Sequence, residues 1–174
     1  DTFSNISFPT IGVDFYSKLY TVNNINLKFQ IWDTSGQSRY RSLTSAYYKV
    51  VDIVLICYDV NERTTFDNII NWYNQLKNIN IDKKLINIIE NKIDTDYSEV
   101  SIYELKELAE ELGINYFQVS AKNNINIEEL FIDICNKFLI SDTRKLKDDA
   151  IVLKSNTINS KTKTKTKTNK CFCL

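Results

Sequence analysis

The chain has 174 residues, of which 43% are apolar, and its 22 basic and 22 acidic side chains leave no net charge. This size and composition fit one packed domain with a tail. The absence of histidine excludes histidine-based proton transfer and most zinc sites. No apolar run approaches the ~18 residues that a membrane-spanning helix needs, and no signal peptide opens the chain, so we expect a cytosolic setting.

Two antiparallel strands are predicted first, at Val13–Val22 and residues 25–32, joined by the polar turn Asn23-Asn24. The second alternates apolar and polar residues, as a half-buried strand does. Residues 53–58 and 85–89 are largely continuous apolar runs, which indicates strands buried on both faces of a parallel sheet. Cys57 lies in the first run and is expected to be a core residue, as is Cys135 further on.

Helical spacing of apolar residues separates and follows these strands. One helix is predicted around Phe66 after a Thr64 cap, and a second after the capping-box pair Ser101 and Glu104, ending at Gly113. A short strand at residues 114–119 and a helix from Ile127 complete the pattern. The alternation predicts an α/β fold of three layers with a mostly parallel sheet, whose ligands bind at the carboxyl ends of the strands.

The helical pattern ends near residue 140, and residues 141–174 are predicted to be a separate, disordered basic tail. From Lys154 onward there are six lysines and no acid, so residues 1–153 carry a net charge of minus six. Four Lys-Thr repeats occupy residues 161–168. Such a segment cannot bury enough apolar surface to offset its ordering entropy.

The first chemical motif, Asp33-Thr34-Ser35-Gly36-Gln37, follows the strand at 25–32. An aspartate there can hold Mg²⁺, the Gly36 amide can approach a phosphate, and Gln37 can orient water. Taken alone, Asp-x-x-Gly is also a common turn.

Two further motifs follow later strands. Asn91-Lys92-Ile93-Asp94 comes after residues 85–89, and the Asp94 carboxylate can accept hydrogen bonds from N1–H and the 2-amino group of guanine. Ser120-Ala121-Lys122 comes after residues 114–119, where a backbone amide can meet the guanine O6. Each motif is weak evidence alone, but all three occur in order at strand ends.

This arrangement resembles the Ras superfamily, and several segments look like those of Rab proteins. They are Thr10-Ile11-Gly12-Val13-Asp14-Phe15, Lys28-Phe29-Gln30-Ile31-Trp32-Asp33, Arg39-Tyr40-Arg41-Ser42-Leu43-Thr44 and Tyr47-Tyr48-Lys49. The resemblance covers residues 1–140. It implies a GTP/GDP-binding switch in vesicle traffic that hydrolyses GTP with Mg²⁺.

The resemblance also implies roles for single residues. Thr10 and Asp33 would bind Mg²⁺, with Thr10 and Gly36 contacting the γ-phosphate, and Gln37 would position water. The guanine pocket would comprise Asn91, Lys92, Asp94, Ser120, Ala121 and Lys122. The expected partners are effectors, an exchange factor, a GTPase-activating protein, an escort protein and a dissociation inhibitor, all meeting a monomer.

Phe15, Trp32 and Tyr47 match the aromatic patch with which Rab proteins contact effectors. By alternation Trp32 falls on the polar face of its strand, and exposed aromatic residues favour binding. The alternative is that the three residues only pack locally.

The end of the chain predicts membrane attachment. Cys171-Phe172-Cys173-Leu174 fits both a Rab double-cysteine ending and a C-a-a-X box whose leucine favours geranylgeranyl. One chain or two remain open, and the lysines would add attraction to an anionic cytosolic leaflet. We therefore expect the cytoplasmic face of an intracellular membrane, with a cytosolic pool. Nucleic acid is not expected, because no aromatic residues interleave the lysines.

Four features depart from the Rab pattern. Ser35 replaces alanine, Ser38 replaces glutamate, and Glu90 replaces glycine, setting a carboxylate beside the expected nucleotide site. No Gly-x-x-x-x-Gly-Lys-Ser/Thr occurs either. We therefore expect a Ras-like P-loop GTPase fold that lacks its first strand, P-loop and first helix, which would precede Asp1.

In the family that strand lies between those expected here at residues 25–32 and 53–58. Its loss would leave unpaired edges and prevent ordinary folding. An incomplete Rab GTPase is the first hypothesis, with residues 1–174 inactive alone. The alternatives are a catalytically dead, membrane-tethered interaction module and a non-Rab Ras relative.

Overall fold

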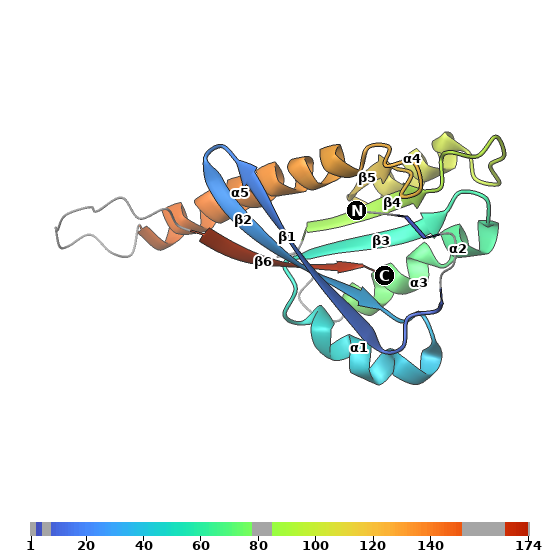
Figure 1. Ribbon diagram of the computed structural model, residues 1–174, viewed down its shortest axis with the longest axis horizontal. Coiled ribbons are helices and arrows are strands. Elements are labelled where there is room, and N and C mark those ends of the chain that lie inside the picture. Colours follow the sequence, from blue (N-terminus) through green and yellow to red (C-terminus); the bar gives the residue numbers. More distant parts are fainter. Residues whose placement is uncertain (1–2, 5–7, 78–84, 151–165, 174) are drawn as a thin grey trace.

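A computed structural model describes residues 3–4, 8–77, 85–150 and 166–173. Its centre is a six-stranded sheet in the order β1-β2-β6-β3-β4-β5, in which β1 is antiparallel to β2 and the other neighbours are parallel (Figure 1). The strands are β1 Val13–Val22, β2 Ile25–Thr34, β3 Ile53–Asp59, β4 Leu85–Asn91, β5 Asn115–Gln118 and β6 Thr166–Cys173. The helices are η1 Ser38–Tyr40, α1 Arg41–Tyr48, α2 Arg63–Asp67, α3 Ile69–Lys77, α4 Ile102–Leu112 and α5 Ile127–Ala150. The predicted three-layer α/β class with a mostly parallel sheet is confirmed.

The β1–β2 hairpin forms as the alternation predicts. Val22 faces Ile25 across the turn, whose residues Asn23 and Asn24 have φ of 51° and 61°. Asparagine tolerates this left-handed region, which a two-residue hairpin turn requires. Leu27 and Phe29 are fully buried, so one face of β2 belongs to the core.

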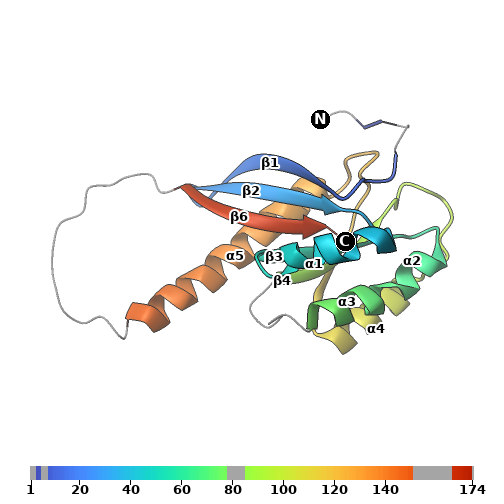
Figure 2. The ribbon, with the colours of Figure 1, turned by 90° about the horizontal axis from the view of Figure 1, so that it is seen from below.

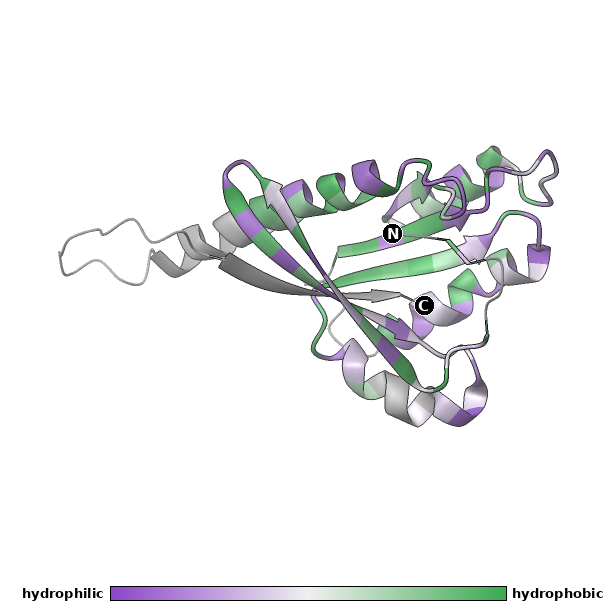
Figure 3. Cartoon of the chain, viewed as in Figure 1, coloured by the Kyte–Doolittle hydropathy of each residue, from purple (hydrophilic) through white to green (hydrophobic). Residues whose placement is uncertain are grey.

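Two clusters of apolar side chains pack on opposite faces of the sheet. One joins β3 and β4 to α1, α2, α3 and α4, with Ile56, Ile88 and Leu105 fully buried. The other packs α5 against β2, β3 and β4 through residues such as Phe29, Ile53 and Ile134. Figure 2 shows α5 apart from α3 and α4, and Figure 3 shows β3 and β4 apolar along most of their length, as buried parallel strands should be.

The first predicted helix differs from the structure in two details. It begins at Arg63 after Glu62 rather than after a Thr64 cap, and it breaks at Asn68 into α2 and α3. The Asn68 side chain donates to the Thr64 carbonyl oxygen at 2.9 Å, a local bond that competes with helix continuation. By contrast, α4 has the predicted capping box and ends at Gly113 with φ 66°.

The two central cysteines have different environments. Cys135, a residue of α5, is buried as predicted, whereas Cys57 is exposed, so its expected core position is wrong. The α5 cluster covers Ile53 and Leu55 of β3 but does not include Cys57 two residues further. The apolar run at residues 53–58 therefore predicts the position of β3 correctly. It does not predict how far along β3 the α5 cluster extends.

The tail is the main correction to the expected architecture. α5 continues to Ala150, and Thr166–Cys173 forms β6 between β2 and β3, where the sequence predicts disorder and an unfilled position. Eight residues of β6 pair with β2 from Asn26 to Asp33, and Cys171 to Cys173 also pair with Ile53 to Leu55. A strand can pair through its backbone without apolar side chains along its whole length. The composition of residues 166–173 therefore does not predict this pairing. Residues 151–165, with most of the Lys-Thr repeats, and Leu174 lie outside the described residues.

Candidate functional site

The two predicted metal-binding residues meet at the carboxyl end of β2. The Thr10 hydroxyl donates a hydrogen bond to Asp33 Oδ2 at 2.7 Å. A backbone bond of 2.9 Å from Ser35 N–H to the Gly12 carbonyl oxygen ties the segment before β1 to the loop after β2. Residues that are 23 apart in the chain are therefore held at one point of the sheet edge.

The donor atoms at this point suit Mg²⁺. The Thr10 hydroxyl and the Asp33 carboxylate are hard oxygen donors, and Mg²⁺ is commonly held by one or two carboxylates together with substrate phosphates. Within the described residues no group of three or more His, Cys, Asp or Glu side chains could hold a metal ion by itself. Thr10 and Asp33 thus supply two oxygen donors of the kind that Mg²⁺ prefers.

Gly36 and Gln37 follow in the same loop. Gly36 is exposed, and a Cβ built there would meet nothing within 4 Å. Gln37 is half-buried, and its backbone N–H donates to Ser35 Oγ at 3.3 Å. Both residues lie in the loop that follows Asp33 and Thr34 at the end of β2.

The loops after β4 and β5 are joined by hydrogen bonds. Asn91 Oδ1 accepts from the Ala121 backbone N–H at 3.1 Å, and Ser120 Oγ donates to Asp94 Oδ1 at 2.6 Å. The bond from Ser120 is the main cause that lowers the pKa of Asp94, with Lys122 Nζ 3.8 Å from its other oxygen. All six residues predicted for the guanine pocket thus belong to one pair of linked loops.

Asp59, which the sequence motifs did not include, contacts Lys92 of the second motif. Lys92 has φ 68° and forms an ion pair with Asp59 at the end of β3. Burial acts to raise the pKa of Asp59, but the hydrogen bonds from Lys92 and Asn61 outweigh it and lower the pKa. The sequence could have indicated Asp59, because it directly follows the apolar run that predicts a buried parallel strand.

A cavity of about 200 Å³ lies beside this ion pair. Its lining residues are Cys57, Tyr58, Asp59, Thr65, Asn91 and Lys92. The exposed Cys57 therefore belongs to the ligand end of the sheet rather than to the core.

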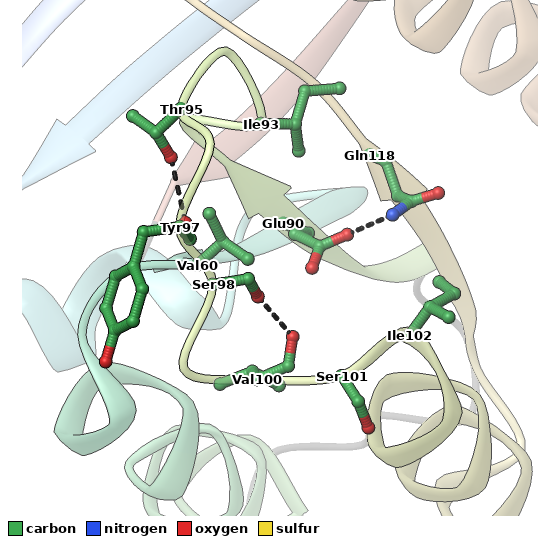
Figure 4. A pocket seen from close by; sticks show the side chains of 10 residues that line it. All are labelled: Val60, Glu90, Ile93, Thr95, Tyr97, Ser98, Val100, Ser101, Ile102 and Gln118. Atoms are coloured by element: carbon green, nitrogen blue, oxygen red, sulfur yellow. Dashed lines mark hydrogen bonds between the residues drawn. The ribbon is translucent and has the colours of Figure 1, made fainter.

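Glu90 does not line this cavity, although Tyr58, its hydrogen-bond partner, does. A carboxylate beside the nucleotide stays a prediction. Glu90 shares its side of β4 with Ile88, in the face that packs against α4, and only 2% of it is exposed. Tyr58 Oη donates to Glu90 Oε1 at 2.9 Å, and Gln118 Nε2 donates to Oε2 at 2.5 Å. Figure 4 shows Glu90 and Gln118 in a separate cavity of about 320 Å³ lined also by Thr95 and Ser98.

The three predicted effector residues form one aromatic cluster. The ring centroids of Phe15 and Trp32 are 4.8 Å apart, and those of Trp32 and Tyr47 are 4.9 Å apart. Phe15 is 44% exposed, while Trp32 and Tyr47 are half-buried against the core on the α1 side. Trp32 is thus less exposed than strand alternation alone predicts, because α1 packs beside it.

Comparison with known proteins agrees with this arrangement. The Ras family profile matches residues 1–140. Ras-related protein RAB1BV from Beta vulgaris is 36% identical over 159 residues, which cover 88% of this chain and 74% of the relative. Ras-related protein Rab-13 from Bos taurus is 33% identical over 176 residues, covering 98% and 84%. GTP-binding protein ypt2 from Schizosaccharomyces pombe is 34% identical over 161 residues, covering 92% and 78%.

The fold, the strand-end motifs and these matches define a small GTPase, and the chain belongs to the Ras family. Its similarity to Rab-named relatives over most of its length places it in the Rab branch. The predicted resemblance is confirmed, and a non-Rab Ras relative is not supported.

Proposed function

We propose that the chain is a Rab-type guanine-nucleotide switch of membrane traffic. The observation that carries this proposal is the pair of bonds, Asn91 to Ala121 and Ser120 to Asp94, that joins the loops after β4 and β5. The Asp94 carboxylate, held by Ser120, would accept two hydrogen bonds from guanine that adenine cannot donate in the same pattern. The Ala121 backbone N–H, which donates to Asn91 Oδ1 in the structure, would exchange that bond for one to the guanine O6 when the base binds.

At the other end of the site, Thr10 and Asp33 would hold Mg²⁺, whose charge offsets that of the phosphates. Gly36 would contact the γ-phosphate through its amide, and Gln37 would orient water. The contact between Thr10 and Asp33 supports this assignment, since it ties the segment before β1 to the end of β2. Loss of the γ-phosphate would release both segments, a change that effectors can detect.

Catalysis is proposed only for a chain that also carries a phosphate-binding loop. The 174 residues contain three glycines and no Gly-x-x-x-x-Gly-Lys-Ser/Thr. Without that loop the phosphates have neither its cradle of backbone amides nor its lysine. We therefore expect residues 1–174 alone to bind GTP weakly and to show no measurable hydrolysis.

Partners and location follow from the family and the end of the chain. We propose that the switch is a monomer that meets effectors, an exchange factor, a GTPase-activating protein, an escort protein and a dissociation inhibitor. Geranylgeranyl groups on Cys171 and Cys173, with the basic tail, would hold it on the cytoplasmic face of an intracellular membrane, beside a cytosolic pool. No described helix is both long and apolar enough to span a bilayer.

A second candidate is a tethered interaction module without catalysis. Two observations favour it: β6 completes the centre of the sheet, and Phe15, Trp32 and Tyr47 present a joined aromatic cluster. In this case the same effector surface would operate without a nucleotide cycle.

Fluorescence titration of the 1–174 chain with GDP and ADP analogues in Mg²⁺ tests the first proposal. We expect weak binding, with dissociation constants of ~10 µM or above, and a preference for guanine of roughly tenfold or more. Equal binding of both bases would contradict the assigned pocket. Reading the transcript upstream of the Asp1 codon separates the two candidates, because an in-frame phosphate-loop sequence supports the switch and an adjacent stop codon supports the module.

A further inference from the structure

The cavity that contains Glu90 has the make-up of a small-molecule site. Its volume of about 320 Å³ lies within the range of such sites, and none of the residues assigned above to the nucleotide lines it (Figure 4). Its apolar lining residues are Val60, Ile93, Val100 and Ile102. Apolar walls around a single buried charged group are typical of pockets that bind small ligands.

The charged group is the Glu90 carboxylate, which is held by two uncharged donors. Tyr58 Oη donates to Oε1 at 2.9 Å from β3, and Gln118 Nε2 donates to Oε2 at 2.5 Å from β5. An ionised carboxylate has about four acceptor positions, so these two bonds leave lone pairs on both oxygens. Within the part of the chain that the structure describes, no lysine or arginine pairs with Glu90. Burial of a charge is costly without a counter-charge, which a cation in the cavity would supply.

The hydroxyl groups that line the cavity offer acceptors. The Thr95 hydroxyl lies within hydrogen-bond distance of three acceptors, of which Asn61 Oδ1 is the nearest at 2.7 Å. The Ser98 hydroxyl donates to the Val100 carbonyl oxygen at 2.5 Å, a bond drawn in Figure 4. Each hydroxyl has one hydrogen, so its remaining capacity is the lone pairs of its oxygen. These two residues therefore suit a ligand that donates hydrogen bonds.

The charge of the surrounding loop also favours a cation. Residues 92–101, between β4 and α4, contain one basic and three acidic residues. The basic residue, Lys92, pairs with Asp59 of β3. Asp96 and Glu99 are exposed, so the loop carries a net negative charge that raises the local concentration of cations.

We propose that this cavity binds a small organic cation whose primary ammonium group pairs with Glu90. The ammonium group has three N–H donors, which match the lone pairs of the carboxylate and of the lining hydroxyl oxygens. A short alkyl chain on the ammonium group packs against apolar walls such as Val60 and Ile102. The inference does not depend on the proposed nucleotide switch, because the two sites share no lining residue assigned to the nucleotide.

The experiment is a titration of the ¹⁵N-labelled 1–174 chain with n-butylammonium chloride at constant ionic strength. The readout is the NMR shift of the Gln118 side-chain amide, because this amide donates to the proposed binding group. We expect a saturable shift with a dissociation constant of ~1–10 mM, which a ligand of this size can reach.

Two further probes separate charge from hydrogen bonding without changing the protein. n-Butanol keeps the alkyl chain and lacks the charge, whereas butyltrimethylammonium keeps the charge and lacks the N–H donors. We expect each to bind at least ~10-fold more weakly, because charge-assisted hydrogen bonds are stronger than neutral ones. Equal binding of all three probes would show an apolar cavity in which Glu90 does not recognise the ligand. No saturable shift with n-butylammonium would overturn the site altogether.

A pair of variants tests the carboxylate directly. Glu90→Gln keeps the size of the side chain and removes its charge, so n-butylammonium should bind at least ~10-fold more weakly. Asp96→Asn removes one charge from the same loop at an exposed residue outside the cavity, and binding should stay within ~2-fold of the unmodified chain. Equal weakening in both variants would reduce the effect to unspecific attraction and contradict the proposal. Urea unfolding checks that each variant is folded, and if Glu90→Gln is not, the comparison of the three probes decides.

Discussion

Ser120 Oγ donates a hydrogen bond of 2.6 Å to Asp94 Oδ1, so a serine after β5 orients a carboxylate that follows β4. The two residues are 26 apart in the sequence, and each belongs to a short motif that is uninformative alone. Their contact gives the proposed guanine pocket a fixed acceptor.

The first prediction concerns base selectivity. Asp94→Asn should reduce the guanine preference of the 1–174 chain by roughly tenfold or more, because an amide cannot accept both hydrogen bonds from guanine. Its nitrogen can instead donate to the 2-oxo group of xanthine, so a xanthine nucleotide should recover binding. The measurement is a titration with GDP, XDP and ADP analogues, with the exposed Asp96→Asn as the matched control. Unchanged guanine preference in Asp94→Asn would place the base elsewhere.

The second prediction concerns the buried Tyr58–Glu90 pair. Burial chiefly raises the pKa of Tyr58, with further contributions from the Glu90 carboxylate. The folded state therefore holds this proton more tightly than the unfolded state. Stability should be complete below the ordinary tyrosine pKa of ~10 and should fall as the pH rises above it.

Urea unfolding between pH 8 and 11 measures this fall. Tyr58→Phe should cost ~1.5–3 kcal/mol at pH 8, since it removes a hydrogen bond to a charged group, and should show a smaller alkaline loss. The exposed Tyr103→Phe on α4 is the control and should keep the wild-type slope. An identical alkaline slope in Tyr58→Phe would exclude this tyrosine as its source. Guanine preference should be unchanged in Glu90→Gln, because Glu90 lies in the other cavity.

The third prediction concerns the start of α4. The Ser101 backbone N–H is the main cause that lowers the pKa of Glu104, to about 2, with Arg63 adding to it. A lowered pKa in the folded state gives stability that is present above the unfolded value of 4.5 and is lost as the pH falls toward 2. Glu104→Gln should therefore reduce the acid dependence of the urea midpoint, whereas the exposed Glu107→Gln should not. Ser101→Ala should cost ~1 kcal/mol at neutral pH, and no loss would mean that the cap contributes nothing.

The fourth prediction concerns the aromatic cluster. Phe15 and Trp32 are opposite each other across β1 and β2, with ring centroids 4.8 Å apart. A double-mutant cycle with Phe15→Leu and Trp32→Leu should give a coupling of ~0.5–1.5 kcal/mol in unfolding free energy. The cycle of Leu19→Ala with Trp32→Leu should give almost none. Similar couplings in both cycles would mean that the rings do not interact specifically.

The sequence predicted the parts of the fold that repeat a side-chain pattern. Alternation located β1 and β2, apolar runs located β3 and β4, and the Ser101 box and Gly113 set the bounds of α4. The strand-end motifs led to the linked loops of Asn91 and Ser120 because parallel strands bring their carboxyl ends to one edge.

The rest of the structure depends on geometry that motif position, composition and periodicity do not encode. Glu90 precedes Asn91 directly, yet adjacent residues of a strand point to opposite faces, so Glu90 belongs to the α4 side. The composition of residues 166–173 favours disorder, but composition carries no information about an available place between two strands. The exposure of Cys57 depends on the end of the covering cluster, which no periodicity in β3 encodes.

The sheet also has an order of synthesis. β6 is synthesised after the other five strands, yet it lies between β2 and β3. Asn26 of β2 and Thr166 of β6, which pair with each other, are about 140 positions apart in the sequence. Within residues 1–174, β1–β2 and β3–β4–β5 are therefore synthesised as two partial sheets before the strand that lies between them. Pairings at such sequence separation form slowly, and unpaired strand edges are prone to association with other chains. When residues 1–174 are translated alone, the edges of β2 and β3 need protection until residues 166–173 are complete.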